Sequence, residues 1–389
     1  MKTKIAIGVI IFAIIVLSFV GLKKYSNQHK ADNTPNSNVI FQPEGQMVTQ
    51  GVETSKKLSE ASSSSISQKA SSIKSCEGNS VNLYKCFAKY YKELVIKSGA
   101  TFAIEDMKKR SSDDYAVLSL CHPLMHVVGR QASESYKTVS EAFSKADSFC
   151  WSGYHHGIME GIIERIGIEN LATELNTICA DVPGKERYTF DYYNCVHGLG
   201  HGIMAELDDE VLESLAMCDN LEGSWEEQSC YSGVYMQNII DSTNVADSGN
   251  TVKYLKPEEP MYPCNIVAEK YKGQCYLGQT SYALQVSGNN LKKVFGMCAN
   301  VNQPYRDICN QSMGRDIANQ VAHDPTGTKN NCSIAVDLND INNCLIGAVK
   351  EIISYYHSDT QAYEFCAILE DAYKNTCTDT TKSYYSVFK

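Results

Sequence analysis

Six of the nine histidines lie between positions 122 and 201, and their spacing suits metal binding. His122 and His126 are four residues apart, and so are His197 and His201. On a helix, this spacing places both side chains on one face. Imidazole binds Zn²⁺, Fe²⁺ and related ions, and helical bundles build di-metal sites from such inward-facing side chains. The pattern therefore predicts a metal site shared by neighbouring helices.

A further adjacent pair, His155 and His156, is followed by Glu160 one helical turn later. Adjacent helical residues point about 100° apart, so only one of the two faces the site. His156 is favoured because its sequence, His-Gly-Ile-Met, recurs at His201. Glu160 is predicted to be a carboxylate ligand or a base, and the ion to be Zn, Fe or Mn. The predicted metal ligands are His122, His126, His156, Glu160, His197 and His201.

Two other interpretations of these histidines stay open. Imidazoles in a tight helical stack can form a hydrogen-bonded core, or they can form a cluster that responds to pH. The protein would then be a non-enzymatic scaffold that holds a protein or peptide partner on its later repeats. If it is an enzyme, metal-activated water or oxygen chemistry is the expected class. The sequence contains no His-Glu-x-x-His motif, phosphate-binding loop or Gly-x-Ser-x-Gly motif.

The sixteen cysteines mark a repeat of about 35 residues. In the clearest copies, two cysteines flank a short connector, and an apolar helical run follows the second. Such units cannot bury their own apolar face, so they must stack. We predict an all-α, solenoid-like domain of α-hairpins stapled by disulfides, with the second cysteine opening a helix. The predicted pairs are Cys76–Cys86, Cys121–Cys150, Cys179–Cys195, Cys218–Cys230, Cys264–Cys275, Cys298–Cys309, Cys332–Cys344 and Cys366–Cys377.

Alignment of the repeats on their second cysteine separates the histidines from the scaffold. Position six is histidine in two early units, at His156 and His201. The later units carry other residues there, namely Met236, Ser281, Arg315 and Lys350. The fold therefore does not require histidine at this position, which favours a specific role in the early units.

The N-terminal region differs from the repeats. An uncharged apolar run from Ile5 to Leu22 lies between lysines and is long enough to span a bilayer. Residues 1–24 are predicted to be an uncleaved signal anchor that binds the membrane as a transmembrane helix, although a cleaved signal peptide has the same features. Residues 25–75 are Ser-rich and are predicted to be a disordered linker. Residues 76–389 form the predicted repeat domain, with histidine-bearing units at about 121–215 and histidine-poor units at about 216–389.

Composition narrows the location and the partners. Disulfides persist outside the cytoplasm, so sixteen cysteines after an apolar leader favour a membrane-anchored protein on the extracytoplasmic side. The formal net charge of -10 argues against non-specific binding of nucleic acid, which requires a basic surface.

Overall fold

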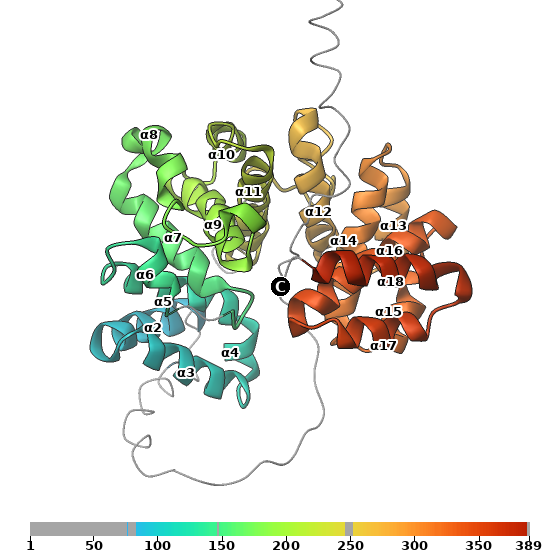
Figure 1. Cartoon of the computed structure of the whole chain (residues 1–389), viewed down its shortest axis with the longest axis horizontal. Coiled ribbons are helices and arrows are strands. Elements are labelled where there is room, and N and C mark those ends of the chain that lie inside the picture. The colour runs from blue at the N-terminus through green and yellow to red at the C-terminus, as the bar shows by residue number, and fades with distance from the viewer. Residues whose placement is uncertain (1–75, 77–82, 146–147, 246–251, 387–389) are drawn as a thin grey trace, which may run out of the picture. The chain divides into compact units, whose positions relative to one another are not determined.

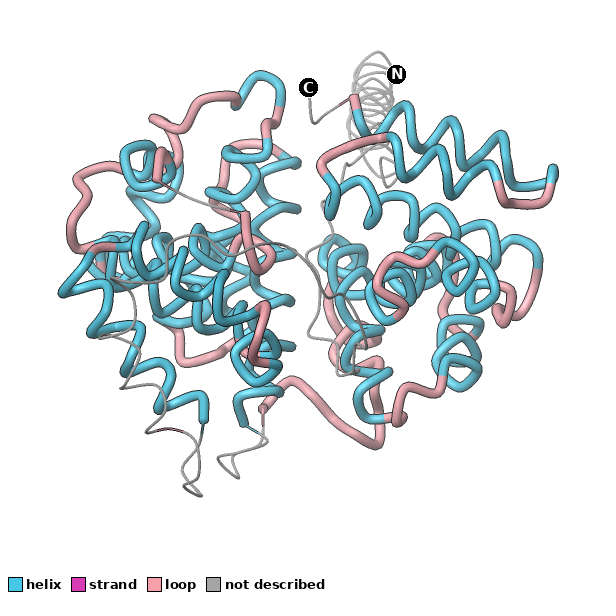
Figure 2. The backbone as a smooth tube through the Cα atoms, turned by 90° about the horizontal axis from the view of Figure 1, so that it is seen from below, coloured by secondary structure: helices cyan, strands magenta, loops and turns pink. Residues whose placement is uncertain are grey.

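The computed structural model describes residues 76, 83–145, 148–245 and 252–386. Across these ranges the protein contains helices and loops and no β-strand (Figure 2). The predicted all-α class is therefore confirmed for the described residues. The predicted anchor and Ser-rich linker lie outside them. Within the described ranges, no helix is both long enough and apolar enough to cross a membrane.

Long helices follow one another along the chain, and each contacts the next long helix (Figure 1). They are α2 (Leu83–Ser98), α5 (Cys121–Ser133), α7 (Gly153–Ile166), α9 (Phe190–Glu206), α11 (Ser224–Val245), α12 (Glu269–Val286), α14 (Tyr305–Gln320), α16 (Leu338–Tyr356) and α18 (Asp371–Tyr385). Shorter helices lie between them in sequence: α3 (Ala100–Ser111), α4 (Tyr115–Ser119), α6 (Val139–Phe143), α8 (Ile168–Ile178), α10 (Val211–Cys218), α13 (Leu291–Ala299), α15 (Pro325–Cys332) and α17 (Thr360–Ala367). A 3-10 turn, Lys185–Arg187, precedes α9. This succession of long and short helices agrees with the predicted helical repeat, although two short helices lie between α2 and α5 and none of the described helices lies between α11 and α12.

Disulfides join each of the eight cysteine pairs predicted from the sequence. Most of them connect the end of a short helix to the following long helix, as Cys218 at the end of α10 does with Cys230 in α11. Closing loops of this length contributes about 2–4 kcal/mol each. Eight disulfides indicate an oxidising environment, either extracytoplasmic or secreted.

The position of the second cysteine corrects one expectation. Cys121, the first cysteine of its pair, does begin α5, and Cys150 lies just before α7, but in α9, α11, α12, α14, α16 and α18 the second cysteine lies at least one turn inside the helix. In α9 and α16 a capping residue precedes the cysteine and sets the start of the helix. Thr189, for example, accepts a hydrogen bond from the backbone nitrogen of Tyr192 at the start of α9. Asp337 caps α16 in the same way.

Glycines of the long helices lie where two of these helices touch. A Cβ atom on Gly157 of α7 would overlap the carbonyl oxygen of His126 on α5. A Cβ atom on Gly233 of α11 would overlap the carbonyl oxygen of His197 on α9. These contacts require glycine, and they hold the backbones that carry the histidines close together.

We expect Gly157→Ala to lower the free energy of unfolding by about 1–3 kcal/mol, because the added methyl group pushes α5 and α7 apart. Gly296→Ala on α13 is the matched control, since its Cβ would meet no atom within 4 Å. Alanine should stabilise that helix by up to about 1 kcal/mol. Denaturant unfolding of metal-free protein measures both. Equal stability of the two variants would contradict the close-contact role of Gly157.

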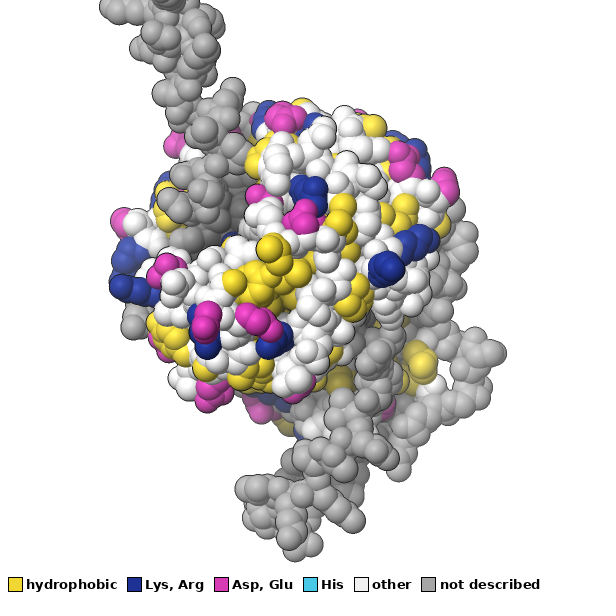
Figure 3. Space-filling model, turned by 90° about the vertical axis from the view of Figure 1, so that its right-hand side faces the viewer, with side chains coloured by type: hydrophobic (Ala, Val, Ile, Leu, Met, Phe, Trp, Pro, Cys, Tyr) yellow, Lys and Arg dark blue, Asp and Glu magenta, His cyan; other side chains and the backbone are white. Residues whose placement is uncertain are grey.

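Charges of both signs are interspersed on the face shown in Figure 3, with small apolar groups between them. The described ion pairs fit this pattern, for example Lys329 with Glu370 at 2.8 Å and Lys374 with Asp371 at 3.0 Å. Exposed pairs of this kind contribute little to stability. Because charges of both signs are interspersed, the described residues on this face form no continuous basic surface.

Candidate metal centre

Helices α5, α7 and α9 bring five imidazoles and one carboxylate together in the interior. The side chains are His122 and His126 from α5, His156 and Glu160 from α7, and His197 and His201 from α9. None of these residues is more than 7% exposed. They form three groups whose ligand atoms lie within 4.8 Å of one another: His122, His126 and His156; His156, His197 and His201; and His126, Glu160 and His201. These buried groups can hold a metal ion.

The adjacent histidines of α7 face different surroundings, as the 100° turn per residue requires. His156 lies among the cluster imidazoles and stacks on His201, with ring centroids 4.4 Å apart and an interplanar angle of 10°. His155 packs against Phe143 instead, with ring centroids 4.6 Å apart. The structure therefore places His156, and not His155, in the centre.

On α5, oxygen acceptors fix the orientation of both imidazoles. The Nδ1 atom of His122 lies 2.7 Å from the main-chain oxygen of Cys150. The Nδ1 atom of His126 lies 2.6 Å from Oε1 of Glu160. Carbonyl and carboxylate oxygens only accept hydrogen bonds, so both Nδ1 atoms carry the proton and donate it. The Nε2 atoms are then the basic nitrogens.

On α9 the Nδ1 atoms of both histidines also face oxygen atoms, and these belong to α11 in the following repeat. His201 Nδ1 donates to the side-chain oxygen of Gln237 at 2.7 Å. His197 Nδ1 lies 2.6 Å from the hydroxyl of Ser232. That hydroxyl donates its own proton to the carbonyl of Ser229 at 3.1 Å, so its oxygen can accept from His197. The hydroxyl of Tyr193 lies 3.1 Å from the same His197 nitrogen and 3.3 Å from Ser232 Oγ. Such outer contacts are typical of metal-binding histidines, because they fix the tautomer and aim the other nitrogen.

The Nε2 atoms meet in two pairs. Those of His122 and His126 are 3.0 Å apart, and those of His197 and His201 are also 3.0 Å apart. Two lone pairs that face each other at this distance repel unless a proton or a metal ion lies between them. Imidazole nitrogens bound to one ion at about 2.0–2.1 Å are about 3.0–3.4 Å apart. The observed distance fits shared coordination and also fits a shared proton.

Glu160 lies behind His126 and interacts through both of its oxygens. Oε1 accepts from His126, and Oε2 accepts from Arg130, whose Nε lies 3.1 Å away. Burial acts to raise the pKa of Glu160, but His126 and Arg130 outweigh it and hold the pKa well below its usual range. Glu160 is therefore ionised, and its geometry favours orienting His126 over direct binding of the ion.

Four polar residues around the centre were missed from the sequence: Arg130, Tyr193, Ser232 and Gln237. Arg130 and Tyr193 each lie four positions from a cluster histidine on the same helix, so the helical spacing contained a signal. Ser232 and Gln237 belong to α11, in the next repeat, and no local spacing connects them to α9.

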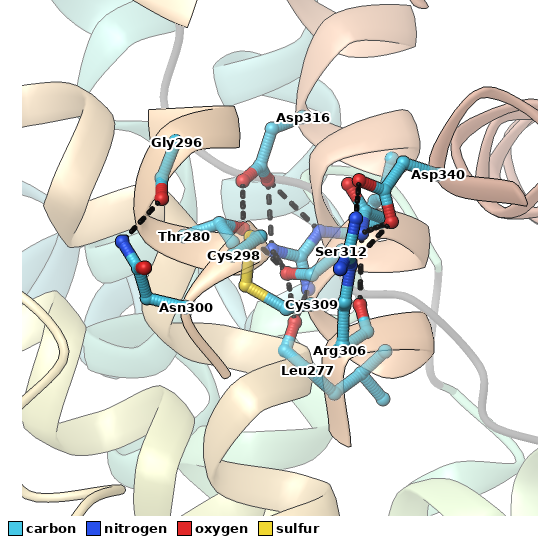
Figure 4. The surroundings of a disulfide bond; sticks show 12 residues. Leu277, Thr280, Gly296, Cys298, Asn300, Arg306, Cys309, Ser312, Asp316 and Asp340 are labelled. Atoms are coloured by element: carbon cyan, nitrogen blue, oxygen red, sulfur yellow. Dashed lines mark hydrogen bonds and ion pairs between the residues drawn. A yellow bond between two sulfur atoms is a disulfide. The ribbon is translucent and has the colours of Figure 1, made fainter. Parts of the chain in front are cut away.

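Hydrogen bonds replace the imidazoles at the equivalent positions of later repeats. Figure 4 shows Thr280 near the Cys298–Cys309 disulfide, where its hydroxyl donates to Asp316 and also contacts the hydroxyl of Ser312. Two further contacts complete this network: Ser281 of α12 and Arg315 of α14 both bond Oδ1 of Asp316, at 2.9 and 2.7 Å. A stack of these repeats therefore closes here on hydrogen bonds, without histidine.

Lys350 of α16 lies six residues after its cysteine, as His156 and His201 do in the early repeats. It gives a test of how stability depends on pH. Its Nζ donates to Oε1 of Gln311 at 2.8 Å, and burial lowers its pKa to about 8. In the unfolded chain the pKa of this lysine is about 10.4. Between about pH 8 and about pH 10.4 the unfolded chain therefore binds more protons than the folded protein, and the free energy of unfolding rises with pH. We expect Lys350→Met to abolish this rise and to be about 1–3 kcal/mol more stable at pH 7.

Denaturant unfolding between pH 7 and 10.5 measures the effect, and Lys374→Met is the control because its side chain is 43% exposed. Parallel stability profiles for the wild type and Lys350→Met would show that burial of this lysine has no energetic consequence.

Comparison with known proteins gives no relative for this chain: no protein-family model, no curated protein and no solved structure matches it. The interpretation of the histidine centre therefore depends on its own geometry.

Proposed function

We propose that this protein is a membrane-anchored, extracytoplasmic helical repeat protein that binds transition-metal ions in a buried histidine centre between α5, α7 and α9. The eight disulfides support the extracytoplasmic location. The membrane anchor is the apolar segment within residues 1–24.

The observation that carries the proposal is the convergence of the Nε2 atoms. Two pairs meet at 3.0 Å, while the Nδ1 atom of each of these histidines faces an oxygen acceptor. A hydrogen-bonded core alone does not require all four histidines to carry their proton on Nδ1. Metal coordination through the four Nε2 atoms does require it. The imidazole-rich set favours Zn²⁺, Fe²⁺ or Cu²⁺ over Mn²⁺, which prefers carboxylate and water ligands.

Burial limits the chemistry of the centre. Because no cluster residue is more than 7% exposed, only small molecules such as water and dioxygen are expected to reach the centre. Metal-activated water or oxygen chemistry is therefore the enzyme class that we propose. The competing function is a structural core in which a proton occupies each Nε2 pair, as the same 3.0 Å distance allows.

Elemental analysis tests the proposal. The full chain is purified without a His tag from an oxidising compartment and compared with the His156→Ala/His201→Ala double variant. His323→Ala is the control, since His323 is a buried histidine that contacts Glu351 and Tyr355 instead of the cluster. We expect at least one metal ion per chain in the wild type and the control, and less metal in the double variant. Absence of metal after reconstitution with Zn²⁺, Fe²⁺, Mn²⁺ and Cu²⁺ would overturn the proposal and leave the structural core.

A further inference from the structure

The centre contains two chelating pairs, and each pair comes from a single helix. On α5, the Nε2 atoms of His122 and His126 converge on each other at 3.0 Å. On α9, those of His197 and His201 do the same at 3.0 Å. An i,i+4 pair of this kind presents two nitrogens to one ion without help from another helix. Each pair therefore defines a separate convergence point.

His156 of α7 lies between the two pairs. It forms one close group with the α5 pair and another with the α9 pair. Its ring lies 5.4 and 5.2 Å from those of His122 and His126, and 5.1 and 4.4 Å from those of His197 and His201, measured between centroids. A third histidine is thus within reach of both convergence points, and to bind the same ion as His201 its ring must turn out of their parallel stack.

One ion cannot use both convergence points fully, because no group of ligand atoms that all lie within 4.8 Å of one another contains both pairs. Imidazole nitrogens bind at about 2.0–2.1 Å, so two ligands of one ion are at most about 4.2 Å apart, and tetrahedral ligands are about 3.4 Å apart. We propose that the cluster is a two-ion centre, with one transition-metal ion at each pair and the His156 ring shared between them. This inference rests on the proposed function and specifies its stoichiometry.

Charge explains why the shared ligand matters. Two divalent ions in a buried site repel each other strongly, and Glu160 contributes little net charge because Arg130 already pairs with it. Metal ligands bind in their deprotonated form and release protons. As the bridge, His156 forms a bond from each ring nitrogen to a different ion and releases its remaining N–H proton to the buffer. The resulting anionic ring lies between the two positive charges.

Copper titration tests the number of ions. Cu²⁺ is added to the folded, metal-free full chain, and bound copper is measured by elemental analysis beside the integrated electron paramagnetic resonance signal. We expect two ions per chain and a signal well below that of two independent Cu²⁺ ions, because a shared ring couples their spins. Calorimetry in buffers of different ionisation enthalpy should detect the proton released at the second binding step.

Single variants separate the two positions. His122→Gln and His197→Gln should each retain one Cu²⁺ with a full, uncoupled signal. His155→Asn is the control and should retain two coupled ions, because His155 lies outside the metal-binding groups. A wild-type stoichiometry of one, lost in both single variants, would overturn the two-ion centre and leave the proposed function intact. No copper or other metal in the wild type would overturn both. The wild-type count needs no variant, so the test survives if a variant misfolds.

Discussion

Asp316→Ala should lower the free energy of unfolding by about 3–5 kcal/mol, because it leaves a buried guanidinium without its counter-ion. Asp316 is 3% exposed and Arg315 is 6% exposed. Oδ1 of Asp316 accepts from Arg315 at 2.7 Å and from Ser281 at 2.9 Å, while Oδ2 accepts from Thr280 at 2.6 Å. The substitution therefore removes one charge and leaves three buried donors short of an acceptor.

Two further variants isolate the cause. Arg315→Met/Asp316→Ala removes both charges and should recover much of the lost stability, since replacing a buried ion pair costs less than breaking it. Asp371→Ala is the surface control, because Asp371 is 97% exposed in its pair with Lys374 and should change stability by less than about 0.5 kcal/mol. Denaturant unfolding measures all three. If the double variant is as unstable as Asp316→Ala, the unpaired charge is not the source of the loss.

The repeat and its disulfides were predictable because the relevant signals are local. Cysteine pairs such as Cys264–Cys275 recur with a short connector, and the apolar runs after them have helical spacing. The start of each helix was not predictable in the same way. The capping residue Thr189 sets the start of α9, whereas the cysteine motif predicts a start at the later residue Cys195.

The centre was predictable only in part. The i,i+4 spacing indicates that His122 and His126 share a face, and the internal comparison of repeats selects His156 over His155. Contacts between helices are not encoded in local spacing, so the roles of Ser232 and Gln237 required the structure. The stacking of α11 on α9 is what brings these two residues to the histidines.

Glu160→Ala should weaken metal binding about 10–100-fold, because the carboxylate holds His126 in its binding orientation. Glu160→Gln should be intermediate, since an amide oxygen can still accept from His126 Nδ1 at the observed 2.6 Å but no longer carries the charge that pairs with Arg130. Glu164→Ala is the matched control, one turn later on α7 and exposed. Competition with a chromophoric chelator measures the affinity of each folded variant. Unchanged affinity in Glu160→Ala would show that His126 needs no orienting partner. A complete loss of binding in both Glu160 variants would instead identify the carboxylate as a direct ligand, as its close group with His126 and His201 permits.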